Sequence, residues 1–108
     1  MAYDAAILDL LREACADITT GERKMFGSHA LMLDGHMLVA AWGDGWLARV
    51  GPGATEDALA LGTEPFAPMG GKGMRGIVYA DIDALEDEAR REALLRMALD
   101  FVSALPPK

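Results

Sequence analysis

The chain has 108 residues, 52% of them hydrophobic and 25% charged, a composition that suits one globular domain with a single core. Its 17 acidic and 10 basic residues give a formal net charge of −7, so direct nucleic-acid binding is not expected as the main activity, because such binding neutralises phosphates with Lys and Arg. The sequence shows no signal peptide and no apolar run that could span a membrane, and we expect one cytoplasmic domain over residues 1–108.

The N-terminal segment is expected to form an amphipathic helix from Asp4 to Ile18. Its apolar residues recur close to the 3.6-residue period of a helix, at Ile7, Leu8, Leu11, Cys15 and Ile18. Asp4 is a suitable N-cap, and Thr19-Thr20-Gly21 is typical of a helix end. Because no base or orienting group accompanies Cys15 in the sequence, we interpret this cysteine as a small buried hydrophobe rather than a nucleophile.

A three-stranded antiparallel meander is predicted next, beginning near Lys24-Met25-Phe26. Asp34-Gly35 separates two apolar runs, which is typical of a hairpin with a two-residue loop. In this register both faces are apolar: one face has Leu31, Leu33, Leu38 and Ala40, and the other has Ala30, Met32, Met37, Val39 and Ala41. The second face either packs on a partner, such as the second copy of a homodimer, or consists of small residues and Met that tolerate partial exposure.

A second hairpin is predicted where two tryptophans flank Gly43-Asp44-Gly45. A three-residue loop with Gly45 in the left-handed conformation would fit this segment. Such a loop would place Trp42 opposite Trp46 as a cross-strand aromatic pair. The third strand of the meander then runs to Val50.

The second half of the chain predicts a short helix, two strands and a long helix. Thr55 can cap a helix over 56–61, and Phe66 lies in a Pro-flanked edge strand. The β-branched and aromatic residues 77–81 predict another strand. Asp83 is expected to cap the last helix, with Glu86 at position N3 of a capping box. The apolar stripe of this helix is Leu94, Ala98, Phe101, Val102 and Leu105. The whole order is α-β-β-β-α-β-β-α, an α+β fold with helices packed on an antiparallel meander.

A glycine-rich loop precedes that last strand and contains a literal G-x-G-x-x-G at Gly71, Gly73 and Gly76. The dinucleotide-binding form of this motif opens a helix, whereas here the glycines lead into a strand, so we reject a nucleotide site. The loop carries Lys72 and Arg75, with Met69 and Met74 beside them. It is either a long connection that needs glycine or a contact loop for an anionic or protein partner.

The spacing of the titratable residues predicts no catalytic group, metal site or bound cofactor. His29 and His36 would start about 13 Å apart in the hairpin, too far to share a metal ion. The cations of the sheet and the glycine loop offer two interpretations. They either gather in one region as an anion site or remain scattered and solvated. The cations are Arg23, Lys24, Arg49, Lys72 and Arg75.

Several short motifs, taken together and in order, are more specific than any one of them. They are Tyr3-Asp4, Lys24-Met25-Phe26-Gly27, Asp34-Gly35-His36-Met37, Arg49-Val50-Gly51-Pro52, Pro68-Met69, Met74-Arg75-Gly76, Val78-Tyr79 and Ser103 to Lys108. In these motifs the chain resembles the TfoX N-terminal domain family, that of the TfoX/Sxy competence regulators, over nearly its whole length. The resemblance implies a compact, secretion-chaperone-like α+β fold and a bacterial, cytoplasmic protein.

For the full-length regulators the resemblance implies co-activation of competence genes together with the cyclic-AMP-dependent activator protein, and it supplies no catalytic residues. The C-terminal helical domain of those regulators has no counterpart in this sequence, so we expect a stand-alone domain. Our first hypothesis is a non-enzymatic interaction domain that modulates transcription by binding protein, with the transcription machinery as candidate partner. Its expected contacts are Lys24, Met25 and Phe26 together with Lys72, Met74 and Arg75. The alternative is a small-molecule or anion-binding domain, with modest enzymatic activity, in which Arg49, Lys72 and Arg75 line one pocket.

Overall fold

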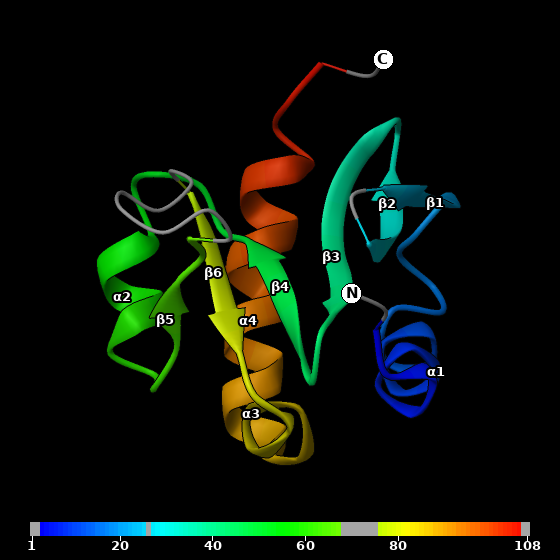
Figure 1. Cartoon of the computed structure of the whole chain (residues 1–108). Helices are drawn as coiled ribbons and strands as arrows, with labels where there is room; N and C mark the ends of the chain where they lie inside the picture. The colour runs from blue at the N-terminus through cyan, green and yellow to red at the C-terminus, as the bar shows by residue number, and fades with distance from the viewer. Residues whose placement is uncertain (1–2, 26, 68–75, 107–108) are drawn as a thin grey trace.

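The computed structural model describes residues 3–25, 27–67 and 76–106, and it has the α+β fold expected from the sequence (Figure 1). Its helices are α1 (Ala5–Ala14), α2 (Thr55–Leu59), α3 (Ile82–Glu86) and α4 (Glu88–Val102). Its strands are β1 (Gly21–Met25), β2 (Ser28–Leu33), β3 (His36–Trp42), β4 (Gly45–Arg49), β5 (Glu64–Pro65) and β6 (Ile77–Ala80). None of the described helices is long and apolar enough to cross a membrane.

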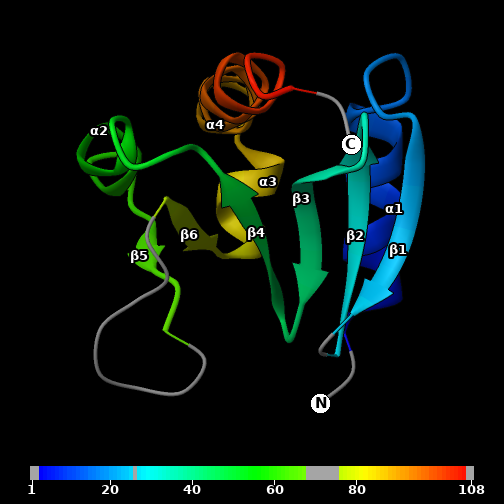
Figure 2. The same ribbon diagram turned by 90° about the horizontal axis from the view of Figure 1, so that it is seen from above.

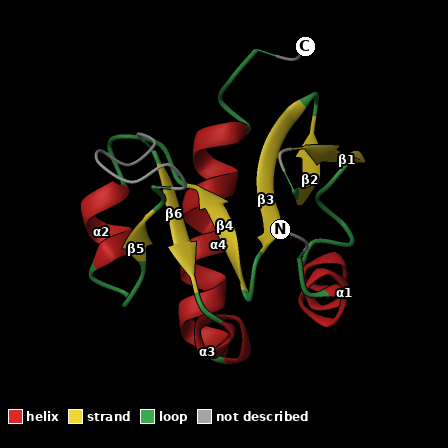
Figure 3. Ribbon diagram, viewed as in Figure 1, coloured by secondary structure: helices red, strands yellow, loops and turns green. Residues whose placement is uncertain are grey.

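The strands form one antiparallel sheet in the order β1-β2-β3-β4-β6-β5. Helices α1, α3 and α4 lie on the same side of this sheet (Figure 2). Residues of all four described helices join the inward face of the sheet in one core, at whose centre Trp46 is completely buried. Figure 3 shows α1 beside the β1 edge, and α2 beside β5 at the opposite edge. The order of elements agrees with the sequence-based expectation, although two of the expected elements are each divided.

The first divided element is the strand that was expected to begin near Lys24. The chain turns back at Gly27, whose φ of 77° suits glycine, so that β1 and β2 pair as a hairpin with Met25 opposite Ser28. Lys24 therefore lies on an edge strand, opposite His29. An edge position with charged side chains is a common way to prevent further strand pairing.

The second divided element is the last helix, because Asp83 does not cap it. The carboxylate of Asp81 accepts a hydrogen bond from the Ala84 backbone N–H and starts α3. Asp87 has extended backbone, with φ −80° and ψ 106°, and its carboxylate accepts from the Arg90 N–H to start α4. Each of two nearby Asp residues can satisfy the free N–H groups of a new helix, so the chain bends between them.

Helix α1 begins as expected, because the carboxylate of Asp4 accepts from the Ala6 N–H. It ends at Ala14 rather than at Ile18, and Cys15 is the C-cap. The thiol is nevertheless fully buried in the core, and burial together with the negative charge of Glu92 raises its pKa to about 11. A thiol with so high a pKa remains protonated and unreactive, in agreement with a packing role.

The Asp34-Gly35 hairpin has the expected two-residue loop, with both residues at positive φ. A bulge then shifts the register between Leu31 and Met32, so that Leu31 pairs with Val39 instead of Leu38. The expected faces are therefore wrong in part. Leu38, Val39 and Ala41 all belong to the core beneath the helices, and Ala40 belongs to the opposite face with Ala30.

The second hairpin also differs from the expectation, because its loop has two residues and Trp42 pairs with Gly45. Gly43, at φ 57°, takes the left-handed position that was expected for Gly45. Consequently the two tryptophans lie on opposite faces. A Cβ at Gly45 would meet the ring of Tyr79 and the carbonyl oxygen of Ala80, so this glycine permits the close approach of β6.

The outer face of the sheet carries a second, smaller apolar cluster. It consists of Ala30, Met32, Ala40, Leu47 and Phe66, with Met37, Trp42, Ile77 and Tyr79 packed against them. No residue of a described helix belongs to this cluster. Both faces of the sheet are thus apolar, as the alternation of the hairpin predicts.

Candidate functional site

Two of the candidate site residues that the structure describes, Lys24 and Arg49, lie at opposite ends of the sheet. Lys24 lies next to the β1–β2 turn, which is at the same end as the β3–β4 turn because His29 pairs with Ala41. Arg49 lies at the other end, opposite Ile77 at the start of β6. Of the remaining candidates, Met25 ends β1, whereas Phe26 and residues 68–75, which include Lys72, Met74 and Arg75, lie outside the described residues.

The described cations do not gather in one region. Lys24 and Arg49 belong to β1 and β4, which are separated by three strand spacings, about 14 Å. Arg23 and Lys24 are exposed on the edge strand, while the Arg49 guanidinium lies 5.6 Å from the ring centroid of Phe101. Arg49 therefore makes a cation–π contact with α4. Of the two interpretations offered for these cations, the described residues Arg23, Lys24 and Arg49 fit separate cations rather than one group.

The end of the glycine loop that is described lies beside Arg49. The Gly51 N–H donates to the Gly76 carbonyl oxygen at 3.0 Å, and a Cβ on Gly76 would lie 3.1 Å from the Gly51 backbone. This close backbone contact at positive φ explains why glycine occupies position 76. The same contact joins Gly76, at the C-terminal end of the loop, to Gly51, which follows Arg49 by two residues in the β4–α2 connection.

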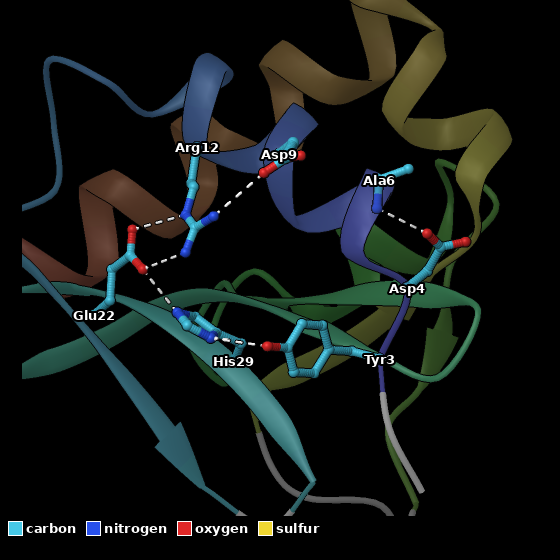
Figure 4. Close-up of polar contacts among 7 residues, drawn as sticks. All are labelled: Tyr3, Asp4, Ala6, Asp9, Arg12, Glu22 and His29. Atoms are coloured by element: carbon cyan, nitrogen blue, oxygen red, sulfur yellow. Dashed lines mark hydrogen bonds and ion pairs between the residues drawn. The ribbon is translucent and has the colours of Figure 1, made fainter.

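A polar cluster joins the β1–β2 hairpin to α1 and to the residue before its N-cap (Figure 4). We call it the hairpin latch, and it consists of Tyr3, Arg12, Glu22 and His29. The His29 Nε2 lies 2.7 Å from Glu22 Oε1, and the Tyr3 hydroxyl lies 3.2 Å from His29 Nδ1. Glu22 also accepts two hydrogen bonds from Arg12, from Nη2 at 2.8 Å and from Nε at 3.0 Å.

The electrostatics of the latch favour an ionised Glu22. Hydrogen bonds from Arg12 and His29 lower the Glu22 pKa to about 2, so the carboxylate remains an acceptor at neutral pH. The Nε2–H of His29 must therefore donate to it, and in a neutral imidazole Nδ1 is then left to accept from the Tyr3 hydroxyl. The carboxylate fixes both the tautomer and the orientation of His29, which is 7% exposed.

The latch acts as a positioning device. It joins the segment before α1, the last turn of α1 and both strands of the hairpin, and so it holds the hairpin that carries Lys24 against α1. The latch does not follow from the sequence-based expectation, which assigns Lys24 and His29 to one strand. Recognising Gly27 as a turn would have placed Glu22 and His29 on one face of a hairpin.

The second histidine has a different role at the far end of the β2–β3 hairpin. Pro106 has a carbonyl oxygen 2.7 Å from His36 Nε2, and since a carbonyl only accepts, Nε2 carries the proton. His36 Nδ1 is buried without a hydrogen-bond partner in the structure. His29 and His36 therefore work separately, and the described residues contain no group of three or more His, Cys, Asp and Glu placed to hold a metal ion.

An aromatic group on the outer face lies near the same end of the sheet as Lys24. Trp42 packs edge-on against Phe66 and Tyr79, with ring centroids 5.0 and 5.9 Å away. The Tyr79 hydroxyl donates to Asp44 at 2.5 Å, and burial together with this carboxylate raises the Tyr79 pKa to about 12. Aromatic side chains with one polar end are typical of protein interfaces. This group was not predicted, because the expected three-residue loop places Trp42 opposite Trp46.

Comparison with known proteins gives one finding. A family model described as the TfoX N-terminal domain matches residues 10–102. The search of curated proteins and the search of solved structures each found no match. The matched range includes the β1–β2 turn, the aromatic group and three members of the latch, Arg12, Glu22 and His29.

Proposed function

Because the chain belongs to the TfoX N-terminal domain family, we propose that it is a non-enzymatic, cytoplasmic bacterial regulatory domain that modulates transcription, of the competence type, by binding protein. The family match carries this proposal. The net charge of −7 fits a domain that joins a DNA-bound complex through protein rather than through phosphate. The candidate partner is a component of the transcription machinery.

The proposed contact surface is the end of the sheet that holds the β1–β2 turn. There the exposed Lys24 lies next to Met25 and Phe26 in the sequence, and the latch holds the hairpin against α1. The half-buried Trp42 and Tyr79 lie at the same end, on the outer face. Trp and Tyr are among the residues that most often dominate the binding energy at protein interfaces. The glycine loop with Lys72, Met74 and Arg75 is the second proposed contact.

The test is affinity capture from a lysate of the source bacterium, with crosslinking and mass spectrometry. We expect the native chain to recover a transcription activator or a polymerase subunit, with crosslinks at Lys24 or Lys72. Lys24→Glu and Lys72→Glu/Arg75→Glu should each reduce this recovery, because they reverse cations at the proposed contacts. The control is Arg96→Glu, which reverses an exposed cation on α4.

Two outcomes would overturn the proposal in different ways. Equal recovery by the native chain and both contact variants would show that the surface is wrong. Recovery of the domain alone would contradict the regulatory function and would favour a homodimer through the outer face of the sheet. Sedimentation at high micromolar concentration would then show whether the isolated chain dimerises.

A further inference from the structure

A cleft of about 250 Å³ lies on the helical side of the molecule, between α1 and the α3–α4 pair. It is lined by Leu10, Glu13, Ala14, Leu85, Arg91 and Glu92. Pockets for drug-sized ligands have volumes of roughly 300–1,000 Å³. This cleft is smaller, and its size suits a single side chain of a partner better than a free ligand.

The cleft has an apolar wall and floor. Leu85, which is 2% exposed, and the half-buried Ala14 form part of the lining. Leu10 is 40% exposed, and among the described residues it is the large hydrophobic side chain that is classed as exposed. Isolated exposed leucines need no explanation, but a leucine at the rim of a cleft offers an apolar anchor point for a partner.

The rim of the cleft is acidic. Glu13 and Glu92 are both exposed, and no cation among the described residues pairs with Glu13. Arg91 is already engaged: it donates to the Leu85 carbonyl oxygen at 3.1 Å and to Glu92 at 3.2 Å, and it lies 3.9 Å from Glu88. The lining residues and Glu88 thus combine one cation with three carboxylates, a net negative charge at the mouth of an apolar cleft.

We propose that this cleft binds a basic amphipathic segment of a partner protein. One apolar side chain of the segment enters the cleft against Leu10 and Leu85, and its Lys or Arg side chains lie against Glu13 and Glu92. The arrangement corresponds to an amphipathic helix bound in a groove. Because the rim of the cleft is negative, charge complementarity favours a positively charged segment. The residues that line the cleft belong to α1, α3 and α4 and not to the proposed contacts, so this inference goes beyond the proposed function and can fail independently of it.

The test uses two synthetic peptides of fourteen residues with leucines at identical helical positions, one filled with lysine and the other with glutamate. Each is titrated into the ¹⁵N-labelled full chain while amide chemical shifts are recorded. We expect the leucine–lysine peptide to shift amides of α1, α3 and α4 around Leu10, Leu85 and Glu92, and to bind more weakly as salt is added. The leucine–glutamate peptide should leave these amides unchanged.

Variants separate the apolar from the ionic contribution. Leu10→Ala should raise the Kd of the lysine peptide roughly fivefold, because the peptide buries the part of the Leu10 side chain that is exposed in the free protein, and alanine lacks that apolar surface. Glu13→Gln/Glu92→Gln should also raise it roughly fivefold, as expected for two exposed ion pairs. Glu56→Gln/Glu64→Gln is the matched control: it removes two exposed carboxylates from α2 and β5 and should leave the Kd within about twofold.

Three results would overturn the proposal. One is that the lysine peptide does not bind at millimolar concentration. Another is that it shifts amides of the sheet rather than of the three helices. The last is an equal loss of affinity in the control pair and in the Glu13/Glu92 pair, because this would mean that the peptide responds to net charge and not to the cleft.

Discussion

At the scale of single residues, Glu22 holds together more elements than its exposed position suggests. Its carboxylate accepts hydrogen bonds from α1 through Arg12 and from β2 through His29, while its own backbone pairs with Leu31. In the sequence nothing distinguishes this residue from the 16 other acidic residues. Its role depends on where the hairpin turns, and therefore on Gly27.

Glu22→Gln should lower the free energy of unfolding at pH 7 by about 1 kcal/mol or less, since the pair with Arg12 is partly exposed and screened. The folded pKa of about 2 lies below the ordinary value of 4.5, so the ionised carboxylate stabilises the fold fully above pH 4.5. This stabilisation should fade as the pH falls from 4.5 towards 2. Urea unfolding at pH 7, 4 and 2.5 measures it.

The control for this measurement is Glu56→Gln, which removes an exposed carboxylate from α2. Its effect should be smaller than that of Glu22→Gln at pH 7. A difference between Glu22→Gln and the native chain that stays constant from pH 7 to 2.5 would contradict the role assigned to the Glu22 charge.

At the scale of elements, short polar signals decided the starts and ends of helices. Asp4 was predicted correctly as an N-cap because the sequence before it offers no competing residue. The segment 81–87 offers three aspartates, and spacing alone selected Asp83, whose Glu86 resembles a capping box. The structure uses Asp81 and Asp87 instead, because a bend between α3 and α4 lets both Leu85 and Leu94 reach the core.

A pair of substitutions distinguishes the two assignments. Asp81→Ala should lower the free energy of unfolding by about 1 kcal/mol, because the Ala84 N–H loses its side-chain acceptor. Asp83→Ala is the matched control and should cost only a few tenths of a kcal/mol, through its interaction with the helix dipole. Chemical denaturation of both variants measures the difference, and a larger loss for Asp83→Ala would contradict the observed cap.

At the scale of the whole molecule, contacts between distant parts of the chain close the fold. His36 in the β2–β3 hairpin and Pro106 after α4 are 70 residues apart in the sequence, and their hydrogen bond ties the C-terminal segment to the sheet. The Leu105 N–H donates to Val102 in the same segment. No local pattern around either residue predicts this contact.

His36→Ala should therefore loosen the segment after α4. The loss of one net hydrogen bond, about 1 kcal/mol, should speed amide hydrogen exchange at Leu105 roughly fivefold. His29→Ala is the control, since His29 belongs to the latch at the opposite end of the sheet and should leave exchange at Leu105 unchanged. Equal acceleration in both variants would mean that general destabilisation, and not the contact with Pro106, is responsible.

The sequence by itself determined the fold class, the order of elements, the Asp34-Gly35 hairpin and the burial of Cys15. These features depend on period, turn chemistry and apolar spacing, which act over a few residues. The sequence also showed that both faces of the sheet are apolar. It also predicted the family, through several different short motifs that follow one another in a fixed order along the chain.

Only the tertiary structure decided which side chains meet. The bulge between Leu31 and Met32 placed Val39 and Ala41 on the helical side, and the two-residue loop placed Trp42 and Trp46 on opposite faces. A shift of one residue reverses every side chain in a strand, so a small difference in turn geometry changes whole faces. The latch and the acidic cleft likewise depend on how α1 packs against elements distant in the sequence, because packing between elements, and not local propensity, brings such groups together.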